Sequence, residues 1–191
     1  MDLGNTTKNQ LEIVLFDKDG FIFTRVKKNN YKLKFFMENN NIILSKIIDF
    51  NLIKLIYDLN GDVYETVSID SLNENEVVAT LLMRPLFQDL GLPQRFSYIH
   101  IKRSVEDNRI IFKGQSIRSC RPEGIPEDAE LMAMEDLTCV CDIVTDHKIK
   151  FSFIILFDPS MNFPSFAEKM VGIILNKIFK RVKQFIENVR L

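Results

Sequence analysis

The chain has 191 residues, which is long enough for one substantial hydrophobic core. Its 25 Lys and Arg almost balance its 26 Asp and Glu, so no global charge favours a nucleic-acid or membrane partner. It has three cysteines, an odd number, and opens with MDLGNTTKNQ, which is not a basic and then apolar leader. We therefore expect an intracellular, soluble protein, cytoplasmic or in a virion, without disulfides or a transmembrane segment.

Residues 11–70 consist of apolar or alternating runs separated by clusters of Asn, Asp, Lys and Gly about every ten residues. This pattern predicts an antiparallel meander of six strands. Residues 42–59 could instead form a helix, because their dense apolar positions fit either period, but Asp49 and Asn51 in the middle favour two strands. In the third run, lysines alternate with four residues that we expect to face the core: Tyr31, Leu33, Phe35 and Met37.

The next segment changes character. Residues 76–82 have a helix-forming composition, and Pro85 predicts that this helix ends near Arg84. From Phe96 onward the strand pattern returns in four runs, the last of which presents one strongly aromatic face. Before the last two runs lies a long loop, 118–130, of the kind that often carries binding residues; a solvated connector with local ion pairs is the alternative.

Residues 163–189 predict a long amphipathic helix. Ser165 and Glu168 have the spacing of a capping box at its start. A wide apolar side suggests burial against a sheet, and it comprises Met170, Val171, Ile173, Ile174, Leu175, Ile178, Phe179, Val182, Phe185, Ile186 and Val189. The opposite side is mostly cationic, so this basic face either is solvated or contacts an anionic surface.

Together these elements predict a protein of the α+β class. Its predominantly antiparallel β-sheet combines the N-terminal six-strand meander with four further strands. A short mid-chain helix and the long C-terminal amphipathic helix complete the fold, with the long helix packed on the sheet. We expect a single compact domain over residues 1–191, with sub-regions 11–70 and 71–191.

The segment IVLFDKDGF, residues 13–21, resembles the first motif of haloacid-dehalogenase-like phosphatases, an apolar strand followed by Asp-x-Asp-Gly-Thr. The resemblance implies that Asp17 is a phosphoryl-accepting nucleophile, that Asp19 is a general acid and base, and that Mg²⁺ is bound. Phe21 stands where the family has Thr. Asp-Gly between two apolar runs is also a common signal for a β-hairpin, which is the alternative.

The sequence offers five soft metal ligands: His100, His147, Cys120, Cys139 and Cys141. None of them forms a Cys-x-x-Cys or His-x-x-x-His pair, so we predict no metal site and expect buried free thiols. No nucleophile elbow or phosphate-binding glycine loop occurs. We therefore assign no catalytic residue and no cofactor.

The order of elements from Phe96 to the end resembles the second half of helix-grip proteins of the START and Bet v 1 kind. In those proteins the last helix lies across a curved sheet and a cavity forms between them, which implies a carrier of a hydrophobic ligand or lipid. The alternative, which we expect, is a filled core lined by Phe151, Phe153, Ile174 and Ile178.

By elimination, the main functional prediction is a non-catalytic structural or interaction protein, a subunit of a larger assembly such as a virion. Its protein partners would bind the exposed strand edges of the meander, and the basic face of the last helix would contact an anionic surface. Specific binding to nucleic acid is not expected. A lipid-carrying cup is the second reading, and a phosphatase that uses Asp17 and Asp19 is the third.

Overall fold

The computed structural model describes residues 12–85, 89, 91–161 and 165–190. Its described strands form one ten-stranded sheet in the order β1-β2-β3-β10-β9-β7-β6-β5-β4, with β8 paired to β6. Neighbours are antiparallel, apart from the short parallel pair β6–β8. The strands are β1 (Ile13–Lys18), β2 (Phe21–Lys27), β3 (Asn30–Glu38), β4 (Tyr64–Asn73), β5 (Glu76–Met83), β6 (Arg95–Glu106), β7 (Arg109–Ser116), β8 (Glu130–Leu131), β9 (Met134–Thr145) and β10 (Lys148–Phe157).

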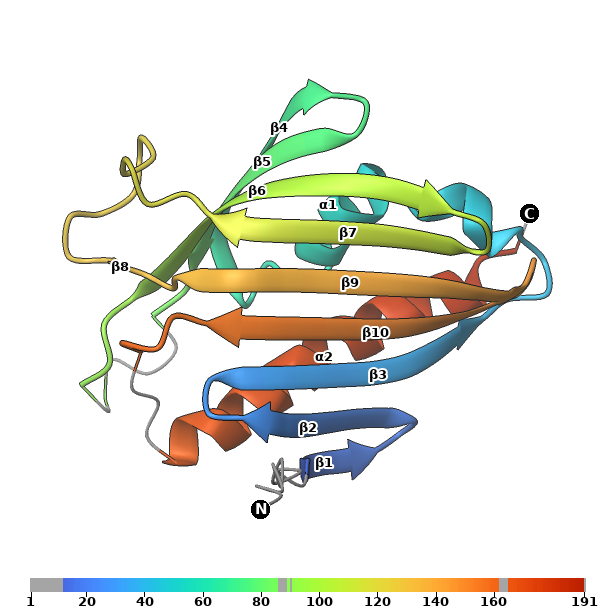
Figure 1. The fold of residues 1–191 in the computed structure, drawn as a ribbon, viewed down its shortest axis with the longest axis horizontal. Helices are drawn as coiled ribbons and strands as arrows, with labels where there is room; N and C mark the ends of the chain where they lie inside the picture. The colour runs from blue at the N-terminus through green and yellow to red at the C-terminus, as the bar shows by residue number, and fades with distance from the viewer. Residues whose placement is uncertain (1–11, 86–88, 90, 162–164, 191) are drawn as a thin grey trace, which may run out of the picture.

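Helices cover one face of this sheet (Figure 1). The long helix α2 (Ser165–Asn188) lies behind β3, β9 and β10, and the short helix α1 (Phe50–Asp58) lies behind β6 and β7. A 3-10 turn, η1 (Leu44–Ile47), precedes α1. The predicted fold class is therefore confirmed: a mostly antiparallel sheet with a short helix and a C-terminal helix.

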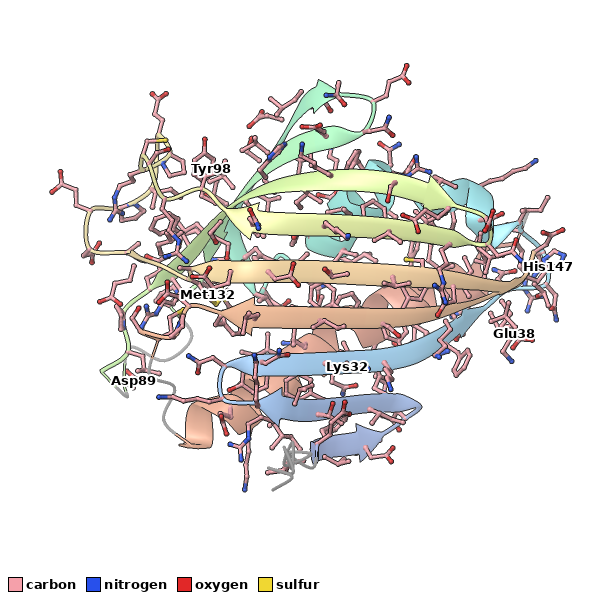
Figure 2. All side chains as sticks on the ribbon, in the orientation of Figure 1. Lys32, Glu38, Asp89, Tyr98, Met132 and His147 are labelled. Atoms are coloured by element: carbon pink, nitrogen blue, oxygen red, sulfur yellow. The ribbon has the colours of Figure 1, made fainter. Side chains whose placement is uncertain are left out.

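The strands β1 to β3 follow the prediction. At the β1–β2 turn, Asp19 and Gly20 have φ angles of 57° and 79°, the left-handed conformations that a tight hairpin requires. Along β3, the four residues predicted to face the core are buried, whereas Lys32 lies on the other face of the sheet, turned away from α2 (Figure 2). β3 then pairs with β10, so the N-terminal hairpin strands lie beside the last strand of the sheet.

The prediction of two strands at residues 42–59 is wrong, because this segment forms η1 and α1. Asp49, which had favoured strands, is the N-cap of α1: its Oδ1 accepts hydrogen bonds from Asn51 N at 2.8 Å and Leu52 N at 3.2 Å. The six-strand meander is thus interrupted after β3. The chain crosses over the face of the sheet through α1, and β4 forms at the opposite edge.

The helix predicted at residues 76–82 is also wrong, because this segment is β5, hydrogen-bonded to β4 and to β6. Val77 and Ala79 on β5 are completely buried. Pairing with a strand on both sides and burial override a helix propensity that amounts to only a few tenths of a kcal/mol per residue. The short mid-chain helix of the predicted fold therefore exists, but it is α1.

The position of α2 agrees with the prediction, but its buried side does not follow the whole predicted apolar stripe. Ile178, Val182 and Ile186 are buried against the sheet, whereas Ile173 is 59% exposed and Phe185 is 46% exposed. Periodicity over 24 residues defines an average direction, and three-dimensional packing selects which part of a wide stripe is covered. The capping box is not confirmed, since the side chain of residue 165 lies outside the described part.

Candidate functional site

Two adjoining cavities lie between the sheet and the two helices, and each has a volume of about 120 Å³. Each is comparable to the engineered cavity of about 150 Å³ that stays dry and binds benzene. The first is also bordered by α1 and β7, and the second by β5 and the β8–β9 connection. The residues that line both cavities are Tyr57, Tyr64, Ile99, Leu137, Phe153, Leu175 and Ile178.

The expectation of a filled core beneath α2 is wrong. The four residues named for that core all line cavity walls: Phe151 the first cavity, Ile174 the second, and Phe153 and Ile178 both. α2 covers the β3–β10 side of the sheet and α1 covers the β6–β7 side (Figure 1). The space lies where the two helices meet over the curved sheet and neither one fills it.

The lining is almost entirely apolar, and its described members include no Lys, Arg or His. One carboxylate, that of Asp49, borders the first cavity, and its oxygens accept hydrogen bonds from Asn51 and Leu52 at the start of α1. Such a surface favours an apolar occupant over water, because water in a cavity needs two to four polar partners.

Tyr57 and Tyr64 are the two hydroxyl-bearing residues among the seven that line both cavities. Their rings meet edge to face, with centroids 5.0 Å apart and an interplanar angle of 87°. Burial raises the pKa of both hydroxyls above the usual value for tyrosine. Both side chains are half-buried, and within the described part of the chain neither hydroxyl makes a hydrogen bond to the protein. Ser97 places a third small hydroxyl at the second cavity.

Polar contacts outside the cavities tie α2 to the rest of the molecule. Near its first turn, Glu168 accepts hydrogen bonds from Arg25 Nη1 at 2.7 Å and from the hydroxyl of Tyr31 at 2.8 Å. Halfway along, Lys177 Nζ lies 2.6 Å from Asp62 Oδ2, and Arg181 also pairs with Asp62. Hydrogen bonds from Arg181 and Lys177 hold the pKa of Asp62 well below its usual range.

The C-terminal end of α2 is held by a buried amide. Asn39, which follows β3, donates from Nδ2 to the carbonyl oxygens of Ile186 at 2.6 Å and of Val189 at 2.9 Å. Its Oδ1 accepts a hydrogen bond from Asn41 N at 2.7 Å. Ile186 O also accepts a hydrogen bond from Val189 N at 3.2 Å. The last carbonyls of a helix have no N–H partner four residues further on, so the Asn39 side chain caps α2 and fixes it to the sheet.

The structure does not bring the predicted phosphatase residues into an active site. Asp17 lies on the edge strand β1, which is antiparallel to β2, and Asp19 lies in the hairpin turn. The carboxylate of Asp19 pairs with Lys180 Nζ at 2.6 Å, and this hydrogen bond lowers its pKa. The phosphatase motif needs an aspartate pair at the end of a parallel strand, so the phosphatase reading is wrong and the hairpin alternative is confirmed.

The two histidines have structural partners. His100 Nε2 lies 2.8 Å from Glu76 Oε2 on the neighbouring strand. His147 Nδ1 lies 2.9 Å from the carbonyl oxygen of Ile42, and its side chain is at the end of the sheet away from Met132 (Figure 2). His147 therefore helps to hold a turn, and His100 helps to join two neighbouring strands. The two histidines do not lie in one site.

The three cysteines are also dispersed. Cys120 is exposed in the long loop, whereas Cys139 and Cys141 share one face of β9 with sulfur atoms 3.8 Å apart and line the first cavity. In the described ranges, no group of three or more His, Cys, Asp or Glu side chains is placed to hold a metal ion. None of the described helices is long and apolar enough to cross a membrane.

The long loop and the basic face of α2 are largely engaged in local contacts. In the loop, Arg118 bridges Glu135 and Asp158, each at 2.6 Å, which agrees with a connector held by ion pairs. On α2, Lys180 pairs with Asp19 as described, and Lys183 pairs with Glu187 one turn away. Binding of an anionic surface or of protein partners stays a prediction.

Comparison of the whole structure with solved structures identifies the class of fold. The human StarD13 (DLC2) lipid transfer and protein localization domain superposes with a TM-score of 0.69 at 12% identity, over 94% of this chain and 90% of that one. Human StAR-related lipid transfer protein 5 gives 0.61 at 15% identity, over 95% and 89%. A STAR-related lipid transfer protein fragment from Xanthomonas axonopodis gives 0.62 at 10% identity, over 92% and 98%.

These likenesses show that the chain has a START-like fold. No protein-family model matches its sequence, and the search of curated proteins finds no match. The helix-grip resemblance noticed from Phe96 onward thus extends over nearly the whole chain. The main functional prediction, a structural subunit of an assembly, is corrected by these neighbours, which are lipid-transfer domains, and by the cavities beneath α2.

Sequence reasoning missed Tyr57 and Tyr64, the polar groups of the cavity wall. Residues 42–59 fit either a helix or two strands, and the preferred strand interpretation assigns no cavity-facing side to Tyr57. One signal was present: Asp49 followed by two turns of apolar residues is a standard helix start, and it would have placed Tyr57 on the same side as Leu52, Ile53 and Ile56.

Proposed function

We propose that this protein binds a hydrophobic small molecule, such as a lipid, in the space between the sheet and α2. The observation that carries the proposal is the pair of adjoining apolar cavities with a common wall of seven residues, Tyr57, Tyr64, Ile99, Leu137, Phe153, Leu175 and Ile178. The START-like fold supports it, because the structural neighbours are named as lipid-transfer domains.

The driving force would be removal of apolar ligand surface from water, about 25 cal/mol for each Å² buried. Ligand sites commonly hold about 300–1,000 Å³, more than either cavity alone. A lipid would therefore join the two cavities by rotating side chains of the common wall, and α2 would shift outward. The polar contacts of α2 with Arg25, Asp62 and Asn39 lie outside the apolar wall.

A cavity-filling substitution tests the proposal. Leu175 lines both cavities, whereas Ile173, two residues away on α2, is 59% exposed and lines neither. We expect Leu175→Trp to weaken binding of the neutral dye Nile red more than about tenfold, a change of roughly 1.4 kcal/mol. Ile173→Trp adds the same indole on the outer side and is expected to bind like the natural protein.

Circular dichroism and urea unfolding would show that both variants are folded. Native mass spectrometry of protein isolated from its own source would show whether an apolar adduct is present and whether Leu175→Trp lacks it. Equal Nile red binding by folded Leu175→Trp and the natural protein would contradict the proposal.

A further inference from the structure

We propose that the molecule bound beneath α2 is uncharged and carries a small hydrogen-bonding group such as a hydroxyl, and that Tyr57 and Tyr64 bind this group. The inference rests on the proposed function and deepens it by naming the class of ligand and the residues that select it. It is carried by the charge of the lining and by the placement of two tyrosine hydroxyls.

The two tyrosines are presented by a well-anchored segment. Tyr57 is in the last turn of α1, Tyr64 begins β4, and the turn between them contains Asn60, which is completely buried. Asn60 Nδ2 donates to the carbonyl oxygen of Ile56 at 2.7 Å, and its Oδ1 accepts from Arg181 Nη1 at 3.1 Å. The turn is therefore fixed to α1 and to α2, and the aromatic rings are held at the wall shared by the cavities.

The two hydroxyls have unused hydrogen-bonding capacity on residues that line the apolar cavities. A tyrosine hydroxyl can donate one hydrogen bond and accept others. Tyr57 and Tyr64 are half-buried, and neither hydroxyl bonds to a described protein group. A ligand hydroxyl could accept from one and donate to the other. Burial raises the pKa of both tyrosines, so each retains its proton at physiological pH and remains a donor.

The lining disfavours a charged ligand of either sign. The residues around both cavities supply no cation to pair with a carboxylate or a phosphate, and an unpaired anion in apolar surroundings pays a large desolvation cost. Asp49 is acidic and would repel an anion further. Its oxygens already accept hydrogen bonds from the start of α1, so a cation would have to compete for them.

Two matched ligand series would test the selection at fixed hydrocarbon skeleton. The first consists of oleyl alcohol, oleate, oleylamine and cis-9-octadecene, and the second of cholesterol, cholesterol sulfate and 5-cholestene. Each compound would displace Nile red from the full-length protein at pH 8. We expect the alcohol to bind more tightly than the charged members and than the hydrocarbon in at least one series.

Single Tyr→Phe substitutions then identify the binding residues, since they remove a hydroxyl and keep the ring. We expect Tyr57→Phe and Tyr64→Phe each to weaken binding of the preferred alcohol about two- to tenfold, the worth of one hydrogen bond. The matching hydrocarbon should bind unchanged. Tyr98→Phe is the control, because Tyr98 lies on β6 but lines neither cavity.

The outcomes separate this inference from the proposed function. Tighter binding of an anion or amine than of the alcohol, or equal effects of the Tyr57 and Tyr64 substitutions on alcohol and hydrocarbon, would overturn the inference. Nile red binding that no alcohol displaces would also overturn this inference, but the proposed binding of a hydrophobic ligand would still be supported. Absence of Nile red binding to the folded natural protein would contradict both.

Discussion

The capping of α2 by Asn39 leads to a prediction that isolates one side chain. Asn39→Asp keeps the size and shape of the residue but replaces a donor of two hydrogen bonds by a carboxylate. The carbonyl oxygens of Ile186 and Val189, 2.6 Å and 2.9 Å from the amide nitrogen, each lose this hydrogen bond. The new charge also faces the negative end of the α2 dipole.

The magnitude follows from these contacts. Each lost hydrogen bond costs about 1 kcal/mol, and a buried anion at a helix C-terminus adds about 1 kcal/mol more. We therefore expect the free energy of unfolding to fall by about 3 kcal/mol, a large part of the total for a natural domain of this kind. Release of the last turn of α2 should also weaken ligand binding beneath it.

Urea unfolding at neutral pH measures the effect as a lower midpoint at unchanged slope. At acidic pH the difference from the natural protein should shrink. The introduced carboxyl is expected to have a raised pKa beside the carbonyls, so as the pH falls it gains a proton earlier in the folded state than in the unfolded state.

Asn188→Asp is the matched control for this experiment. Asn188 is at the same end of α2, but it is exposed and bonds only to the carbonyl oxygen of Gln184 among the described groups. It introduces the same charge near the same helix terminus, and its cost should stay below about 1 kcal/mol. Equal shifts of the unfolding midpoint by the two substitutions would refute the capping role of Asn39.

Three further predictions follow from packing and ionisation. Gly172→Ala should lower the free energy of unfolding by about 1–2 kcal/mol, measured by thermal or urea unfolding. The added Cβ would lie 2.9 Å from Cδ1 of the buried Phe23, and this overpacking outweighs the gain in helix propensity. A more stable variant would show that the Phe23 ring moves aside freely. Burial raises the pKa of all four tyrosines. Their ionisation should therefore not change the free energy of unfolding below about pH 10 and should lower it above that pH, as the unfolded chain ionises first. Near-ultraviolet titration, free of tryptophan absorbance, would contradict this if any tyrosine ionised at its ordinary pKa in the folded state. A thiol reagent should modify the exposed Cys120 first and Cys141 last, as measured by mass spectrometry. The contact with Cys139 and burial raise the pKa of the Cys141 thiol and so make it less reactive. Early modification of Cys141 would show that the first cavity opens readily.

The elements predicted correctly depend on neighbours close in sequence. Asp19-Gly20 specifies a hairpin through its left-handed backbone, and the alternation of Leu33 and Phe35 with lysines defines the inward face of β3. The long amphipathic stripe predicted α2 in the same way. These patterns repeat every two or every three to four residues, so a short stretch of sequence contains the information.

Residues 42–59 and 76–82 were predicted incorrectly because their apolar positions are compatible with either period, and contacts far along the chain decide between them. β5 is a strand because β4 and β6 pair with it on both sides. α1 is a helix that packs across the face of the sheet, near α2, a segment more than a hundred residues later.

The presence of a cavity is the feature that the sequence predicts least, because it depends on the tertiary structure. The sequence by itself determined the apolar character of Phe153, Leu175 and Ile178, and a filled core uses the same residue types as a binding site. Whether these side chains touch one another or enclose a space depends on the curvature of the sheet and on where α1 and α2 rest against it. Those distances result from packing among all the elements, so only the three-dimensional structure shows a space that Tyr57 and Tyr64 face.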